Sequence, residues 1–282
     1  MNLISTTVSM NANELKKILK EIQDGEKTWE EESKVFILKS MIKHIGSTDS
    51  ELRDQLIYNT FCQLTLKNQL DHELLNELLD ICLSDLLFRG IGENGTDTVF
   101  TRSFTTLLIT LILYRDNEDN FLSQSMVYKI KDRLIYYINS EKDLRGYVFE
   151  KGWAHSVAHV ADAFEQLLKN PKINPDLYLE ILKPLWNKIF VSKSVYVHNE
   201  DERLLIPILE MLNNGLEQKE IEALIRNIPI ELKIQKEQIA EEKYWFLFAN
   251  CKTFLKSFLL IVNRNSKFLP IQKSIESCLT EL

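Results

Sequence analysis

Two histidines and an aspartate stand close together near the middle of the chain, and their side chains could bind a metal ion. His155, His159 and Asp162 belong to the segment GYVFEKGWAHSVAHVAD, residues 146–162. The pattern of residues 152–170 predicts a helix that begins at Gly152, and this helix would carry the three side chains on one side. Imidazole nitrogens and carboxylate oxygens suit zinc, iron or manganese. The spacing therefore predicts a divalent-metal site, with the same three residues as candidate catalytic groups.

The same segment also has an interpretation as an anion site. Residue 156 is Ser, so the glutamate of the H-E-x-x-H motif, which acts as general base in zinc proteases, is missing. Backbone N–H groups at a helix start near Gly152 would instead attract a phosphate or carboxylate, with Arg145 and Lys151 adding positive charge. His155 could then act as acid or base, because an ordinary histidine titrates near neutrality.

A third interpretation gives these residues a structural role only. In it, the two histidines and Asp162 form an ordinary solvated helix face, Asp143 and Arg145 hold the preceding loop, and Trp153 fills the core. The sequence leaves the three interpretations open.

Asp143, Arg145 and Trp153 of this region are also candidate ligand-binding groups, and charged residues elsewhere could join them. Arg102 stands in the otherwise uncharged stretch VFTRSFTTLLITLIL, where a buried guanidinium needs a carboxylate partner. Glu202 and Arg203 open a later helix, where acidic residues also stabilise the helix N-terminus. The earlier neighbours Arg53 and Asp54 are typical of an exposed salt bridge.

Helices must position all of these residues, because strand and turn signals are rare. The 282 residues include only 8 glycines and 6 prolines, and apolar residues recur at three- and four-residue steps almost throughout. Two capping boxes begin at Thr28 and Thr48. The predicted helices are Glu30 to Gly46, Glu51–Lys67, Asp71–Phe88, Val99–Arg115, Ser123–Ser140, Gly152–Asn170, Asp176–Phe190, Glu200–Asn214, Gln218–Asn227 and two or three more after about Lys233.

Roughly twelve helices joined by short loops predict an all-α fold of stacked antiparallel helix pairs. The arrangement would be a HEAT-like α-solenoid, and a compact α/α bundle or ring is the alternative. The loops 89–98 and 169–175 are the best candidates for a domain boundary. We expect both to be surface loops within a single domain, residues 1–282.

Charge and composition exclude some partners. The net charge is −7, whereas nucleic acids and anionic membranes attract clustered positive charge. The four cysteines are far apart and form no metal or disulfide motif. The N-terminus lacks the pattern of a signal peptide, and the apolar segment 244–262 contains two lysines, so we expect it to be a core helix. These features predict a cytoplasmic protein with no membrane or nucleic-acid partner.

The chain resembles an uncharacterised bacterial family, the domain of unknown function number 2785. The resemblance is carried by Glu51-Leu52-Arg53-Asp54 with Tyr58, Ile91-Gly92-Glu93, Val99-Phe100-Thr101-Arg102-Ser103-Phe104, Asp143-Leu144-Arg145-Gly146, Gly152-Trp153-Ala154-His155 with Ala158, His159 and Asp162, and Glu202-Arg203. It implies one helical domain and transfers no activity.

Two functions remain open at this stage. The first is a non-enzymatic helical scaffold that binds a protein or small ligand on its concave face, as helical repeat proteins often do. The second is a metal- or anion-dependent enzyme that uses His155, His159 and Asp162, and it requires these residues to converge with Arg102, Arg145 and Glu202.

Overall fold

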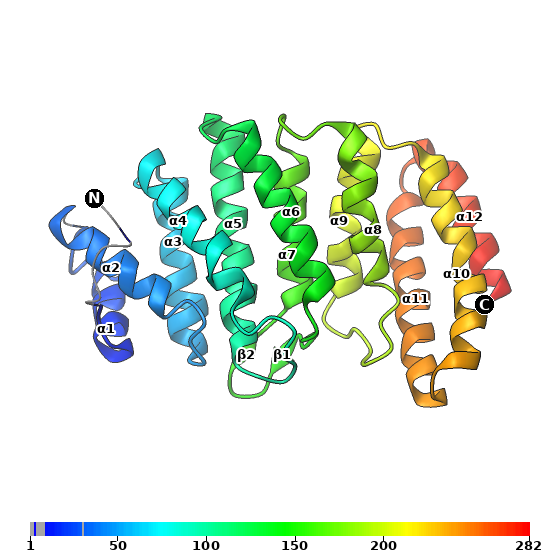
Figure 1. Ribbon diagram of the computed structural model, residues 1–282, viewed down its shortest axis with the longest axis horizontal. Helices are drawn as coiled ribbons and strands as arrows, with labels where there is room; N and C mark the ends of the chain where they lie inside the picture. The colour runs from blue at the N-terminus through cyan, green and yellow to red at the C-terminus, as the bar shows by residue number, and fades with distance from the viewer. Residues whose placement is uncertain (1–2, 4–8, 30) are drawn as a thin grey trace. The chain divides into compact units, whose positions relative to one another are not determined.

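The computed structural model describes residues 3, 9–29 and 31–282, without the side chains of residues 31 and 32. Within these residues the chain forms twelve α-helices, one π-helix, three short 3-10 helices and one two-stranded sheet (Figure 1). The prediction of an all-α fold is confirmed. The chain divides into two compact units, Met1–Lys172 and Ile173–Leu282, so the division falls in the loop 169–175. The single domain and the HEAT-like solenoid stay predictions.

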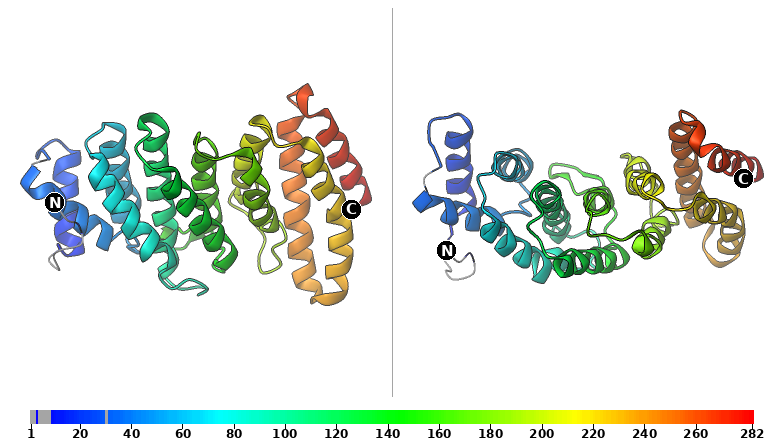
Figure 2. Two further views of the ribbon diagram at one scale, coloured as in Figure 1. Left: turned by 45° about the horizontal axis from the view of Figure 1, so that its top comes forward. Right: turned by 90° about the horizontal axis from the view of Figure 1, so that it is seen from above.

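The first unit contains seven α-helices among its described residues, and a β-hairpin separates the last two of them. Its elements in chain order are α1 (Ala12–Gln23), α2 (Glu31–Lys43), the π-helix η1 (Glu51–Tyr58), α3 (Asn59–Leu66), α4 (His72–Ser84), the 3-10 helix η2 (Leu86–Phe88), α5 (Thr98–Asp119), α6 (Gln124–Ser140), β1 (Tyr147–Val148), β2 (Gly152–Trp153) and α7 (Ser156–Leu168). Seen from above, α3, α5 and α7 lie in one layer and α4 and α6 in the other (Figure 2).

Helix α5 is the centre of the first unit. It packs against α3, α4, η2 and α7, and its side chains are buried on all sides from Val99 to Ile109. The buried hydroxyls remain satisfied because Thr105 and Thr106 donate to the carbonyl oxygens of Thr101 and Ser103, at 2.7 and 2.6 Å. This stretch, uncharged apart from Arg102, is therefore a core helix whose hydroxyls bond to its own backbone.

Several helix boundaries differ from the predictions. The helix predicted at 51–67 is a π-helix followed by α3, and its first turn is capped by Asp49 rather than Thr48, through the 3.2 Å bond from Leu52 N to Asp49 Oδ1. The Thr28 capping box involves residue 30 and the side chain of residue 31, outside the described residues. The predicted helix 152–170 begins only at Ser156. A β-hairpin takes the place of its first turn.

The second unit contains the remaining five described α-helices. Its elements are the 3-10 helix η3 (Pro175–Leu177), α8 (Tyr178–Asn187), α9 (Glu200–Asn213), α10 (Gln218–Gln238), α11 (Glu241–Val262), the 3-10 helix η4 (Ser266–Phe268) and α12 (Leu269–Glu281). Helix α10 continues past Pro229, beyond the end predicted at Asn227.

Helix α11 is the described helix that is long and apolar enough to cross a membrane. Length and composition alone are weak evidence, because core helices pass the same test. One face of α11, which includes Leu247, Phe254 and Phe258, is buried, and the helix packs against α9, α10 and α12. Trp245 and Leu260 on the other side are 53% and 66% exposed, so the expected core helix is buried on one face only.

Candidate functional site

A hairpin of residues 145–155 forms the centre of the candidate site (Figure 1). Its strands pair Tyr147 with Trp153 and Val148 with Gly152. The pairing continues beyond the strands, because the N–H groups of Ala154 and His155 donate to the carbonyl oxygens of residues 146 and 145, at 2.8 and 3.0 Å. Glu150 and Gly152 have positive φ angles of 61° and 78°, which let the chain reverse direction between the strands.

Aromatic rings run from the surface of this hairpin into the core. Trp153 meets Tyr147 edge-on at 5.2 Å and stacks on His155 at 4.6 Å between ring centroids. His155 is 5.7 Å from His159, and His159 is 5.5 Å from Phe104. The outer end of this aromatic row is open to solvent, since Tyr147 is 53% and Trp153 39% exposed. Trp153 therefore does not fill the core, and that expectation was wrong.

Arg53 attaches the π-helix to the hairpin. Its guanidinium donates to the carbonyl oxygens of Ser47, at 2.6 Å, and Lys151, at 2.8 Å. It also lies over the ring of Phe100 at 4.4 Å and forms an ion pair with Asp54, at 2.7 Å from Nε to Oδ1. Arg53 is fully buried, so the expectation of an exposed salt bridge was wrong. Burial lowers the pKa of Arg53 and raises the pKa of Asp54.

Gly152 allows the hairpin to sit directly on the π-helix. A Cβ at this position would lie 2.9 Å from Ser50 Cβ and 3.0 Å from an Arg53 guanidinium nitrogen. Such distances are shorter than ordinary van der Waals contact. The positive φ of Gly152 also disfavours any residue with a side chain. Gly152 is therefore required for close packing and for the local backbone, not for a helix start.

Arg102 and Glu141 form a buried ion pair at the base of the hairpin. Nε and one terminal nitrogen of Arg102 donate to the two oxygens of Glu141, at 2.6 and 2.9 Å. The other terminal nitrogen donates to the carbonyl oxygens of Arg89 and Gly90 and to Thr98 Oγ1. Burial lowers the pKa of Arg102, but the hydrogen bonds and the negative charge of Glu141 outweigh the effect of burial. The pKa of Arg102 is therefore raised. The expected carboxylate partner is confirmed.

Asp143 and Arg145 form a second ion pair that joins the hairpin to the loop 89–98. Arg145 donates to both carboxylate oxygens of Asp143, with 2.8 Å from Nε to Oδ1, and these bonds raise the pKa of Arg145. Asp143 also accepts the N–H of Gly95 at 2.9 Å, and Arg145 donates to Thr96 O at 2.6 Å. The pair therefore holds the loop 89–98 against the hairpin, whereas the sequence predicted that it would hold the loop preceding the helix.

Ser103 and His159 form a buried pair that resembles a nucleophile and its base. Ser103 Oγ lies 2.7 Å from His159 Nδ1 and also bonds to the carbonyl oxygen of Ala154. Because a carbonyl can only accept, the serine proton goes to Ala154 and Nδ1–H of His159 must donate to Ser103. His159 therefore carries its proton on Nδ1. Ser103 is fully buried and its proton does not go to the histidine, so the pair is arranged for positioning rather than for nucleophilic attack.

The predicted metal ligands lie near one another but not as expected. His155 is the residue before α7, with a left-handed φ of 49°, and is not part of the helix. His159 is 8% exposed, so the expected solvated face was wrong for this residue, and Asp162 is half-buried one turn later. Among the residues that the structure describes, no group of three or more His, Cys, Asp or Glu side chains could hold a metal ion.

The cations proposed for the anion site bind carboxylates of the protein instead. Arg145 is paired with Asp143, and Lys151 Nζ lies 2.7 Å from Asp97 Oδ1. The helix start that was to supply N–H groups is at Ser156 and not at Gly152. Arg102 and Arg145 thus have carboxylate partners inside the first unit, and their convergence with the histidines stays a prediction.

Glu202 and Arg203 lie on α9, in the second unit. Glu202 is exposed and Arg203 is half-buried. Their neighbour Asp201 is 7% exposed and accepts a hydrogen bond from the Ser257 hydroxyl at 2.5 Å. The convergence of Glu202 with the histidines stays a prediction, because the histidines belong to the first unit and Glu202 belongs to the second.

Comparison with known families supports the resemblance seen in the sequence. The model of the family described as "Protein of unknown function (DUF2785)" matches residues 87–260, more than half of the chain. The chain belongs to this family. The match includes the hairpin, α7 and the Glu202–Arg203 pair, whereas the π-helix precedes it. No curated protein and no solved structure matches the chain.

Proposed function

We propose that this member of the family is a non-enzymatic helical scaffold that binds a protein or small ligand through the hairpin 145–155. The observation that carries the proposal is that large aromatic side chains are exposed on this hairpin, while hydrogen bonds of buried charged residues hold its backbone. Phe149, at the turn, is 81% exposed, and Tyr147 and Trp153 are 53% and 39% exposed. Exposed aromatic clusters are typical of binding surfaces.

The buried ion pairs support a binding role because they would keep the hairpin in one conformation. Isolated buried charges are costly, and each pair must be held by further hydrogen bonds to be stable. Here those bonds go largely to backbone atoms of the hairpin, such as Lys151 O, and of the loop 89–98, such as Gly95 N. A preorganised loop loses less conformational entropy when it binds, which increases affinity.

The internal pairing of the charged residues argues against the enzyme alternative. Arg102 and Arg145 neutralise carboxylates of the chain itself, and Ser103 is buried with its proton on a backbone carbonyl. The stacked rings of Trp153 and His155 offer a flat face for a ligand or an apolar partner surface,. We propose the hairpin as the ligand's position in place of the concave face that the sequence predicted.

We place this function in the cytoplasm and exclude nucleic acid and membranes as partners. All four cysteines are free thiols, and burial raises the pKa of Cys251 to about 12, which is typical of inert thiols in a reducing compartment. The net charge of −7 disfavours anionic polymers and lipid surfaces,.

The test is an affinity capture with three immobilised proteins in lysate of the source organism. These are the parent protein, Phe149→Ala with Trp153→Ala, and the control Trp245→Ala, which removes another exposed tryptophan, 53% exposed, from α11. Bound proteins and small molecules are identified by mass spectrometry, and their affinities are then measured by calorimetry.

We expect a ligand that binds the parent and the control equally and the hairpin variant at least about tenfold more weakly, as for loss of an aromatic hot spot. A ligand that binds all three proteins equally would overturn the role of the hairpin. Chemical conversion of that ligand by the parent protein would overturn the non-enzymatic part of the proposal.

A further inference from the structure

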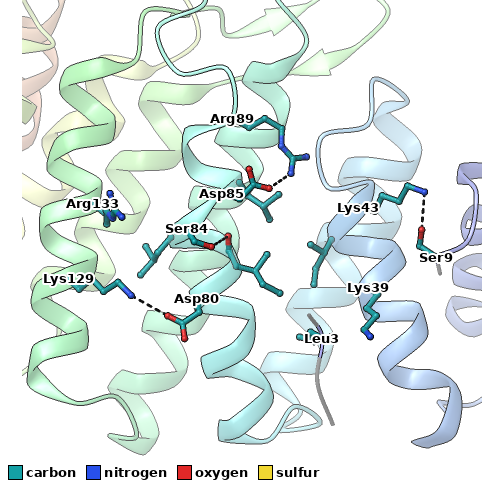
Figure 3. Close-up of a pocket in the computed structure, with 14 residues that line it drawn as sticks. Leu3, Ser9, Lys39, Lys43, Asp80, Ser84, Asp85, Arg89, Lys129 and Arg133 are labelled. Carbon is teal, nitrogen blue, oxygen red and sulfur yellow. Dashed lines mark hydrogen bonds and ion pairs between the residues drawn. The ribbon is translucent and has the colours of Figure 1, made fainter. Parts of the chain in front are cut away.

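A groove of about 710 Å³ lies between α2, α4 and α6 (Figure 3), and none of its residues belongs to the hairpin. Apolar side chains contribute to its lining, including the half-buried Ile42 and Ile81 and the buried Leu86. Leu3 also lines it and is 5% exposed, which means that the groove already covers one aliphatic side chain. Its surface is therefore suited to further apolar side chains.

Basic side chains line this groove on two opposite sides. Lys39 and Lys43 belong to α2, and Lys129 and Arg133 belong to α6. In Figure 3 the two pairs stand on either side of α4. Within each pair the residues are four positions apart, so they lie on the same face of their helix. Each pair therefore forms a short positive row of about 6 Å along its helix.

The groove carries an excess of positive charge in an acidic protein. Its lining contains five Lys and Arg residues against two aspartates, a net charge of +3, whereas the whole chain carries −7. The two aspartates form ion pairs with two of these cations: Asp80 Oδ1 lies 3.3 Å from Lys129 Nζ, and Asp85 pairs with Arg89. Lys43 instead donates to the neutral hydroxyl of Ser9 at 2.9 Å, and Arg133 lies over the ring of Phe88 at 5.1 Å. Both sides of the groove thus keep a cation that no carboxylate of the lining neutralises.

We propose that this groove is a docking site for an acidic amphipathic helix of a partner protein. The helix would place apolar side chains at i, i+3, i+4 and i+7 against the apolar lining. Carboxylates that flank this apolar stripe would then meet the α2 row on one side and the α6 row on the other. Carboxylates four residues apart on a helix repeat at about 6 Å. The two cations within each row have the same spacing along their helix.

The placement of the cations favours such a helix over a small anion. Sites for small anions gather their polar groups around one point. In this groove the rows stand apart, with the apolar residues and α4 between them. A helix with an apolar stripe and two acidic flanks satisfies both parts of the lining at once. The site goes beyond the proposed function because it is separate from the hairpin.

The test uses a fluorescent designed helix with leucines at i, i+3, i+4 and i+7 and glutamates on both flanks. A second peptide keeps the leucines and replaces every glutamate by lysine, and vesicles of phosphatidylglycerol serve as an anionic surface. Fluorescence anisotropy measures peptide binding to the full chain, and cosedimentation measures vesicle binding. One double variant reverses the charges of the groove, Lys43→Glu with Arg133→Glu, and a milder one removes them, Lys43→Gln with Arg133→Gln. The control, Lys17→Glu with Lys219→Glu, reverses two charges outside the groove, on side chains that are 78% and 67% exposed.

We expect the acidic peptide to bind the parent and the control variant at least tenfold more tightly than the basic peptide. The glutamine variant should lose about threefold and the glutamate variant at least tenfold in affinity, because each removed charge weakens a rim contact. Equal binding of the two peptides, or unchanged binding by both groove variants, would overturn the proposal. If the groove variants lose vesicle binding but keep peptide binding, the proposal is overturned in favour of a lipid surface.

Discussion

Replacing Gly152 by alanine should detach the hairpin from the π-helix and destabilise the first unit. The added Cβ would stand 2.9 Å from Ser50 Cβ and 3.0 Å from the Arg53 guanidinium. Carbon atoms in contact normally lie about 3.5–4.0 Å apart, and overpacking of this kind costs about 1–3 kcal/mol. The left-handed backbone at φ +78° adds about 1–2 kcal/mol for a residue with a side chain. Together they predict a loss of about 2–5 kcal/mol.

Gly92→Ala is the matched control for this prediction. Gly92 also has a left-handed φ, of +86°, but a Cβ there would meet no atom within 4 Å. Only the backbone cost of about 1–2 kcal/mol applies to it. Urea denaturation followed by circular dichroism gives the free energy of unfolding of each variant. Equal losses for Gly152→Ala and Gly92→Ala would refute the close packing of the hairpin on the π-helix.

Three further predictions concern charge. Arg102→Met should cost about 3–5 kcal/mol of unfolding free energy because it leaves Glu141 buried without its cation, and adding Glu141→Leu should restore much of that loss in a double-mutant cycle. Hydrogen bonds from two lysines of α1 lower the pKa of Glu51 in the folded state. The ionised Glu51 therefore stabilises the fold above the unfolded carboxyl pKa of about 4.3. This stabilisation is lost as the pH falls through the lower pKa of the folded state. The difference in urea midpoint between the parent and Glu51→Gln should therefore close between about pH 5 and pH 2, and a constant difference would contradict the assignment. Zinc titration calorimetry should give the same weak binding for the parent and for His155→Ala with His159→Ala, whereas stoichiometric zinc lost in that variant would establish the metal site.

The sequence predicts the helices well where their signals are local. The helix predicted at 123–140 is α6, with Ser123 as its cap through the 3.2 Å bond from Met126 N. The need of Arg102 for a carboxylate also followed from its uncharged surroundings. Both inferences depend only on neighbouring residues and on the cost of burying an unpaired charge.

The hairpin could not be predicted because contacts distant in sequence determine it. Gly152 and the histidine spacing favoured a helix, but the bond from Arg53 to Lys151 O joins residues 98 positions apart. The same tertiary contact places Arg53 in the core, where the sequence indicated an exposed salt bridge. His159 is buried because Ser103 of α5 lies beside it, and helix periodicity alone does not contain that information.

Amide hydrogen exchange of the hairpin tests most directly whether buried charges hold the aromatic surface in place. The N–H groups of Ala154 and His155 donate to backbone carbonyls at 2.8 and 3.0 Å, so in the parent they should exchange as slowly as those of α5. In Arg53→Met, which removes the bond to Lys151 O, they should exchange much faster while α5 remains protected. Exchange in the parent at the rate of the exposed loop 89–98, or no change in Arg53→Met, would contradict the account.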